Sequence, residues 1–192
     1  DLTFVLLATI CDVMPLRKIN RIIAIKVFKK FHIKDIYIFD KIFLLKKINR
    51  PFEINDMGYL VGPILNSAGR LDNPNKVVEL LFVDNLSLKN KIIKQLLLIN
   101  EKRKKIESDI IKKLNLGNFR KTNDAVLFEY SQILNEGLIG IIAAKLKENF
   151  NKPCIVMTKK NDIYKASVRS TSNFNIGKYI KQAIDQNLLI NG

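Results

Sequence analysis

One stretch divides this sequence into two parts: Ser87-Leu-Lys-Asn-Lys-Ile-Ile-Lys-Gln-Leu-Leu-Leu-Ile-Asn-Glu-Lys-Arg-Lys-Lys-Ile-Glu-Ser-Asp-Ile-Ile-Lys-Lys-Leu114. Its apolar residues recur at intervals of three, four and seven, with Lys and Glu between them, which predicts an amphipathic helix. Gly117 follows where a helix C-cap is expected. At 1.5 Å per residue, about 28 residues span roughly 42 Å, enough to connect two domains. Heptads are not sustained, which argues against a coiled coil.

After Gly117 the pattern becomes α/β. Short apolar runs alternate with an amphipathic segment, and Lys160-Asn161-Asp162 provides a turn. Asn175 stands where it can cap a final helix. We therefore expect a small mixed sheet with helices packed on it, made of strands at 125–130, 154–158 and 163–170 and helices at 137–150 and 176–187.

The residues before the long helix are expected to be mainly helical. Leu2 to Val13 has helical spacing and ends before Pro15, and a second helix starts at about Asn20. The alternation across residues 35–45 predicts a strand. Asn55 is expected to cap a short helix through Val61, and Gly62-Pro63 to stop it and start a loop that ends at Asp72.

The composition is that of a globular protein with a polyanionic partner. Hydrophobic residues make up 47% of the 192 residues, and 33 Lys and Arg stand against 18 Asp and Glu, a net charge of +15. No apolar run of about 18 residues occurs, so no membrane span is expected. Cys11 and Cys154 do not form a paired framework, which indicates reduced thiols and a cytoplasmic protein. Asp1 precedes the first apolar run without a basic flank, and we expect an internal piece of a longer protein.

Asp12 is the first candidate site residue. It lies in the last turn of the first helix, where the macrodipole disfavours a carboxylate by a few tenths to about 1 kcal/mol. A bound metal ion would compensate that charge. The alternative is an exposed carboxylate that pairs with Arg17 or Lys18.

Asn66 and Arg70 are the second candidates, in the segment from Gly62 to Asp72. Its glycines and small side chains let a ligand approach the backbone, and a guanidinium grips a phosphate through two parallel hydrogen bonds. The alternative is a structural contact of Arg70 with Asp72 or Glu79 in a tight turn.

Ser167 and Arg169 are the third candidates. They alternate along the strand at 163–170 and therefore share one face, with Val168 directed into the core. A hydroxyl beside a guanidinium suits a terminal phosphate, whereas the alternative is the polar face of an edge strand. His32 is the one histidine, which excludes a zinc site or triad built on several histidines, and we expect it at the surface near a helix end.

Four segments occur in order and carry a resemblance to a known family. They are Ala8-Thr-Ile-Cys-Asp12-Val-Met-Pro-Leu16, Gly62-Pro-Ile-Leu-Asn-Ser-Ala-Gly-Arg-Leu-Asp72, Asn135-Glu-Gly-Leu-Ile-Gly-Ile-Ile-Ala-Ala-Lys-Leu146 and Lys165-Ala-Ser-Val-Arg-Ser170. Together they resemble the RecJ family of single-strand-specific 5′→3′ DNA exonucleases, in the DHH phosphoesterase superfamily. The similarity covers essentially the whole chain.

The resemblance implies a role for each candidate. Asp12 matches the last metal-binding aspartate of the catalytic domain. Arg70 matches an active-site arginine that contacts substrate phosphate, with Asn66 beside it. Ser167 and Arg169 match the pair that holds the 5′-terminal phosphate.

The resemblance also implies an architecture. It comprises the C-terminal part of a DHH catalytic domain (residues 1–82), a long connecting helix (83–117) and a DHH-associated substrate-binding domain (118–192). Two divalent cations, Mn²⁺ or Mg²⁺, would activate water for attack on a phosphodiester. Most of their ligands would lie outside this chain, which alone is expected to be inactive.

The implied substrate is single-stranded DNA, in DNA repair and recombination. Candidate protein partners are a single-strand-binding protein or a helicase, and a monomer is expected. The alternatives are a DHH phosphodiesterase of short oligonucleotides or cyclic dinucleotides and a non-catalytic relative that binds single strands.

The sequence departs from the family pattern in several places. It has no Asp-His-His segment and no Gly-Gly-His segment. Asn135 stands where the family has His, which leaves any special role of that position open. Ile64 occupies a position that is often basic, so one phosphate contact is weakened.

Overall fold

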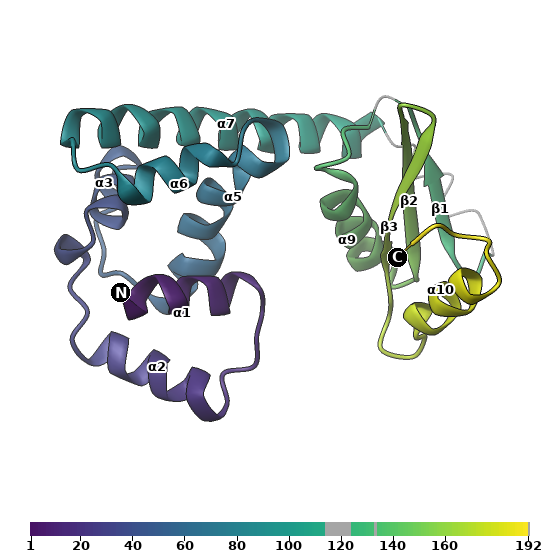
Figure 1. Cartoon of the computed structure of the whole chain (residues 1–192), viewed down its shortest axis with the longest axis horizontal. Helices are drawn as coiled ribbons and strands as arrows, with labels where there is room; N and C mark the ends of the chain where they lie inside the picture. Colours follow the sequence, from purple (N-terminus) through teal and green to yellow (C-terminus); the bar gives the residue numbers. More distant parts are fainter. Residues whose placement is uncertain (114–123, 133, 192) are drawn as a thin grey trace. The chain divides into compact units, whose positions relative to one another are not determined.

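The computed structural model describes residues 1–113, 124–132 and 134–191. They form two compact units, Asp1–Arg103 and Lys104–Gly192. The boundary falls inside α7 (Leu86–Lys113), the long helix that the sequence predicts (Figure 1). The expected end of this helix at Leu114 and its cap at Gly117 lie outside the described residues. The division at residues 82 and 117 stays a prediction.

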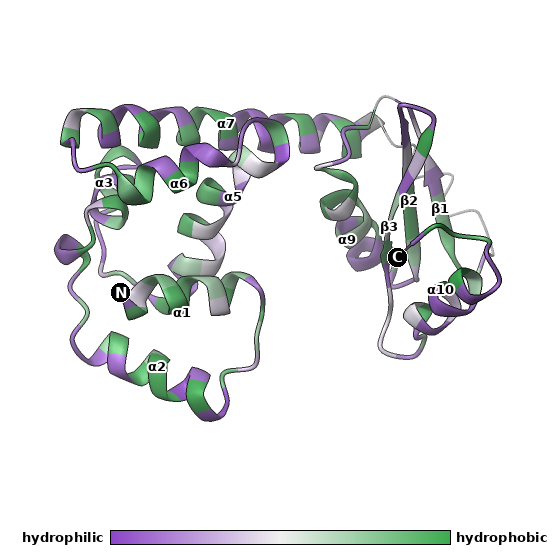
Figure 2. Cartoon of the chain, viewed as in Figure 1, coloured by the Kyte–Doolittle hydropathy of each residue, from purple (hydrophilic) through white to green (hydrophobic). Residues whose placement is uncertain are grey.

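The first unit is built from helices around one apolar core. Figure 2 shows α1 as almost continuously apolar, whereas α2 and α7 alternate between apolar and polar residues. Residues that are fully removed from solvent include Leu6, Phe39, Ile64 and Leu96. The elements before α7 are α1 (Leu2–Cys11), α2 (Lys18–Lys29), the 3₁₀ turn η1 (Ile33–Asp35), α3 (Tyr37–Leu45), α4 (Ile54–Asp56), the π-helical turn η2 (Met57–Val61), α5 (Gly62–Leu71) and α6 (Asn75–Phe82).

The expected strand at residues 35–45 is wrong, because this segment forms η1 and α3. Ile38, Phe39, Ile42 and Phe43 are buried, a spacing of one, four and five residues that only a helix brings to one side. Phe52 lies against this side, 5.4 Å from Phe39 between ring centroids. The local alternation of apolar and polar residues favoured a strand, but packing of the aromatic side chains stabilises a helix here.

The expected cap at Asn55 and stop at Gly62-Pro63 are also wrong. Glu53 is the N-cap of α4, and Asp56 completes a capping box with it. The Gly62 N–H bonds back to Met57 O, five residues earlier, so the chain passes from a π-helical turn directly into α5. Pro63 lies in the first turn of α5, where a missing N–H costs little.

The second unit contains a three-stranded sheet among its described residues. The elements are β1 (Leu127–Tyr130), α9 (Ile139–Phe150), β2 (Cys154–Lys160), β3 (Ile163–Arg169) and α10 (Ile176–Asp185). The order is β1-β2-β3, with β1 parallel to β2 and β3 antiparallel to it. Asn161 and Asp162 both have positive φ and form a tight turn between β2 and β3. The expected α/β class with a mixed sheet is confirmed.

One face of this sheet packs against α9. Cys154, Val156 and Thr158 of β2 are buried on it, and the Thr158 hydroxyl donates to Leu134 O at 2.8 Å. Val168, expected in the core, is only half-buried and belongs to the opposite face. Asn175 is the N-cap of α10 as expected, although its side chain makes no capping bond and the Ile176 N–H donates to Ser170 Oγ at 3.1 Å. No helix in the described ranges is long and apolar enough to cross a membrane.

Candidate functional site

Asp12 is the C-cap of α1 and is exposed. Its N–H bonds to Ala8 O at 2.9 Å, which leaves the carboxylate at the negative end of the helix. Within the described ranges it forms no ion pair with Arg17 or Lys18, the alternative considered for it. Burial, together with the Asp12 charge, raises the pKa of the neighbouring Cys11 thiol. The carboxylate is therefore available to a cation from solvent.

Contact between α1 and α5 fixes Asp12 relative to the other candidates of this unit. Cys11 Sγ donates to Met57 O at 3.6 Å, and the same sulfur lies directly against Gly62 at the start of α5. Arg70 is eight residues further along this helix, roughly 12 Å along its axis. The segment from Gly62 to Asp72, expected to be a loop, is therefore a helix that fixes the separation between the end of α1 and Arg70.

Asn66 and Arg70 lie one helical turn apart and therefore on one side of α5. Asn66 is exposed and Arg70 is half-buried. The other side packs on α7, where Ser67 is buried with its hydroxyl 2.6 Å from Ile64 O and 3.3 Å from Leu96 O. Ser67 thus serves packing on α7, whereas Asn66 is exposed and Arg70 is half-buried on the other side.

Gly69 is a feature of the same side that the sequence reasoning did not single out. A Cβ added there would meet only Pro74, at an ordinary 3.8 Å, so the fold does not require glycine. Glycine inside a helix costs about 1 kcal/mol relative to alanine. Bare backbone beside Asn66 and Arg70 lets a ligand approach closely.

Asp72 ends α5 and is bound by its neighbours. Lys76 Nζ lies 2.6 Å from Asp72 Oδ2, and the Asn73 N–H donates to Oδ1 at 2.8 Å. Lys76 first, and then the Asn73 N–H, hold the pKa of the Asp72 carboxyl below its ordinary value. Ile64, at the position that is often basic in the family, is a core residue with 1% exposure.

Ser167 and Arg169 of β3 share one sheet face, as their alternation predicts. That face packs against α9, whereas the expectation of Val168 in the core had put the two residues on the other side of the strand. Gly140 of α9 lies opposite both: the position of an added Cβ would be 3.4 Å from Ser167 Oγ and 3.5 Å from Arg169 Nη2. Arg169 Nη2 also lies 3.5 Å from Gly140 O, a long contact at an exposed position. The hydroxyl and the guanidinium therefore meet over one glycine. The sequence reasoning quoted Gly140 in a motif but gave it no role.

Glu136 extends this group and was not singled out either. It lies before α9, 3.0 Å from Lys160 Nζ through Oε1 and 2.8 Å from Lys165 Nζ through Oε2. Lys165 and then Lys160 lower the pKa of the Glu136 carboxyl. The spacing of two residues between Lys165, Ser167 and Arg169 could have indicated that Lys165 lies on the same strand face. Asn135 accepts the Gly137 N–H at 2.8 Å, a local turn that gives it a structural role.

Residues for a complete metal centre are not gathered in the described part of the chain. No group of three or more His, Cys, Asp or Glu side chains occurs among those residues. Asp12 can therefore supply one carboxylate ligand.

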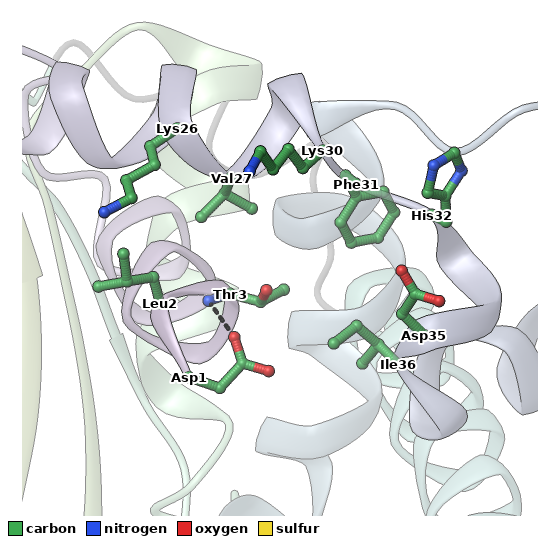
Figure 3. Close-up of a pocket in the computed structure, with 10 residues that line it drawn as sticks. All are labelled: Asp1, Leu2, Thr3, Lys26, Val27, Lys30, Phe31, His32, Asp35 and Ile36. Carbon is green, nitrogen blue, oxygen red and sulfur yellow. Dashed lines mark hydrogen bonds between the residues drawn. The ribbon is translucent and has the colours of Figure 1, made fainter.

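A separate hollow of about 420 Å³ opens beside α1 and α2. Figure 3 shows Lys26, Lys30 and His32 at its border, with Asp35 just below His32. Asp1 also borders it, and its carboxylate is occupied by the Thr3 N–H at 2.9 Å. His32 is exposed just after α2, as expected. None of the predicted site residues lines this hollow, and its charges are mixed.

Comparison with known proteins finds relatives that are similar to most of this chain. Residues 123–187 match the DHHA1 domain. The chain is 30% identical over 196 residues to the single-stranded-DNA-specific exonuclease RecJ of Haemophilus influenzae, covering 96% of this chain and 34% of that protein. The RecJ of Escherichia coli is 31% identical, with 96% and 33% covered. The chain thus spans about a third of the length of these relatives.

The fold also matches solved structures. RecJ of Thermus thermophilus in complex with Mg²⁺ superposes with a TM-score of 0.79 at 20% identity, covering 96% of this chain and 29% of that one. The same protein in complex with Mn²⁺ gives a TM-score of 0.80 at 19% identity. The matched residues, 96% of this chain, include both units.

Proposed function

We propose that this chain is a segment of a RecJ-type 5′→3′ exonuclease of single-stranded DNA. The premise is its match to the DHHA1 domain and its similarity to RecJ along 96% of its length. The first unit would contribute to the reaction centre, and the second unit would hold the 5′ end. The observation that carries the proposal is the convergence of Ser167 Oγ and Arg169 Nη2 over Gly140.

This convergence suits a terminal phosphate for three reasons. A guanidinium and a hydroxyl donate to phosphate oxygens, and the charge-assisted bonds are about twice as strong as neutral ones. Gly140 has no side chain to fill the space between them. Helix α9 begins at Ile139, so its positive end adds to the attraction.

The accessible side of α5 suits a phosphate inside the strand. Arg70 would grip its oxygens, Asn66 would donate to the same group or to the sugar, and Gly69 would let the backbone of the strand come close. These groups are mounted on a helix whose other side contacts α7 through the Ser67 hydroxyl, 3.3 Å from Leu96 O. A rigid mounting of this kind favours an oriented phosphodiester.

Divalent cations fit this chain in part. Asp12 offers an exposed carboxylate at a helix C-terminus, an environment that favours a cation, and the remaining ligands would come from beyond the described residues. Bound Mn²⁺ or Mg²⁺ would supply an activated water and stabilise charge on the phosphate. The part of Asp12 is to hold one ion and that of Arg70 to orient the phosphate.

The cellular setting follows from the same proposal. Single-stranded DNA processing places the protein in the cytoplasm and in DNA repair and recombination, as a monomer with a single-strand-binding protein or a helicase as candidate partners. The net charge of +15 favours a nucleic-acid partner.

The test uses the full-length RecJ-type protein with Arg169→Ala. Hydrogen bonds to a charged group contribute about 1.5–3 kcal/mol, so the preference of kcat/KM for 5′-phosphorylated over 5′-hydroxyl strands should fall roughly tenfold to a hundredfold. Turnover of 5′-hydroxyl strands should change little. An unchanged ratio, or hydrolysis of cyclic dinucleotides in place of strands, would contradict the proposal.

A further inference from the structure

We propose that Lys165 is the third donor to the 5′-terminal phosphate and that Glu136 is the positioning residue that holds it in place. This inference rests on the proposed function and adds two residues to the pocket of Ser167 and Arg169. Every group that it involves belongs to the second unit.

The strand register places Lys165 in the same row as Ser167 and Arg169. In β3 the three residues alternate, and they pair with Thr158, Val156 and Cys154 of β2, which are the buried residues under α9. Successive members of the row are about 6.8 Å apart along the strand. Lys165 is therefore the next residue to Ser167 in this row, and its long side chain can reach toward the space in which Ser167 and Arg169 meet.

The ion pair with Glu136 determines where that ammonium lies. Glu136 Oε2 is removed from solvent and lies 2.8 Å from Lys165 Nζ in an ion pair without hydrogen-bond geometry, whereas Oε1 accepts a hydrogen bond from Lys160 Nζ at 3.0 Å. A free lysine side chain loses rotamer entropy when it binds a phosphate, and an existing ion pair reduces that loss. Because an ammonium has three donors, Lys165 can keep Glu136 and bind a phosphate oxygen at the same time.

The charge balance allows this arrangement. Lys160, Lys165 and Arg169 outnumber the one carboxylate among them, so the group remains positive with Glu136 ionised. The lowered pKa of Glu136 keeps it ionised near neutral pH. Lys160 differs from Lys165 in position, since it pairs with Ile163 at the hairpin end, about 14 Å along the strand from Ser167, whereas the Lys165 backbone is about 7 Å from Ser167.

The test measures binding by this 192-residue chain, because the pocket lies within one unit. The probe is a short oligothymidylate with a 5′-phosphate or a 5′-hydroxyl, at fixed salt, and the quantity is the ratio of the two Kd values. Lys165→Met should reduce the preference for the phosphate about three- to tenfold. Lys160→Met is the matched control and should leave the ratio unchanged, although it breaks a bond to the same carboxylate.

Glu136→Gln distinguishes positioning from a simple change of charge. Loss of the negative charge strengthens binding of every phosphate, whereas loss of positioning weakens only the terminal one. We expect Glu136→Gln to lower the ratio when Lys165 is present and not to lower it in the Lys165→Met background. Lys165→Arg should restore part of the preference. Thermal unfolding of each variant confirms that it is folded.

The outcomes separate this inference from the proposed function. If Arg169→Ala erases the preference but Lys165→Met leaves it intact, the inference is overturned and the proposed pocket stands. A Glu136→Gln variant that raises the ratio with Lys165 present overturns it too. If the unaltered chain shows no preference for the 5′-phosphate, both the pocket and its extension are wrong.

Discussion

Arg70 projects from a helix rather than from the loop that its glycines and small neighbours had indicated. This difference sharpens its role. A guanidinium on a flexible loop would have to be ordered on binding, whereas one on α5 begins from a backbone already fixed against α7. Asn66 shares that backbone one turn earlier.

In the full-length protein, Arg70→Ala should lower kcat and kcat/KM together, by roughly a hundredfold, because a contact to the reacting phosphate is lost. Binding of the strand should change less, since many lysines attract its backbone. Arg70→Lys keeps the charge but loses the paired geometry, and should recover only part of the rate. Steady-state kinetics of the folded variants tests this contact. An unchanged kcat in Arg70→Ala would show that Arg70 is a structural residue.

At the scale of elements, the crossing of α1 and α5 depends on one glycine. Gly62 lies against Cys11 Sγ, and an added Cβ would come within 2.7 Å of Met57 O. Met57 O belongs to the π-helical turn and already accepts the Gly62 N–H, so it cannot move away easily. The close approach of the two helices places Asp12 beside the start of α5.

Gly62→Ala should therefore destabilise the chain by about 1–3 kcal/mol through overpacking. Gly69→Ala is the matched variant in the same helix: its Cβ meets only Pro74 at 3.8 Å, so it should stabilise by about 0.4–1 kcal/mol. Chemical denaturation measures both values. In the full-length protein Gly69→Ala should nonetheless lower turnover, because its methyl group occupies the surface that the strand approaches. A stabilised variant with full activity would show that no ligand comes close to Gly69.

At the scale of the whole molecule, the net charge and the candidate metal ligands point to different properties. The described residues contain no group of three or more His, Cys, Asp or Glu side chains, so Asp12 is not part of such a group. The net charge of +15 favours a polyanionic partner. We therefore expect binding of single strands and their hydrolysis to be separable in this chain.

The 192-residue chain should bind single-stranded DNA with an affinity that falls as salt rises, yet release no nucleotides with Mn²⁺ or Mg²⁺. Gel electrophoresis of end-labelled strands measures release, and Asp12→Ala is the control. Metal-dependent degradation that disappears in Asp12→Ala would show that the ligand inventory is wrong. Binding that is insensitive to salt would contradict the electrostatic basis of the interaction.

The sequence by itself determined the features that depend on local periodicity. The long helix, the strand-helix-hairpin pattern and the shared face of Ser167 and Arg169 follow from repeats of 3.6 and 2 residues, which backbone geometry imposes within each element. The quoted segments also sufficed to recognise the relatives of this chain. These features are read within one stretch of residues, so no knowledge of packing is needed.

Tertiary structure alone decided whatever depends on contacts between distant residues. Residues 35–45 became η1 and α3 because Phe39 and Ile42 are buried in a core shared with other helices. Gly62–Leu71 became a helix because Ala68 is buried in that core and Ser67 contacts Leu96 of α7. The same holds for the group over Gly140 and for the pair of Lys165 with Glu136, whose partners are 29 residues apart in the chain. Burial and ion pairing stabilise these arrangements only once the elements have packed, and no local pattern records which distant side chain will arrive.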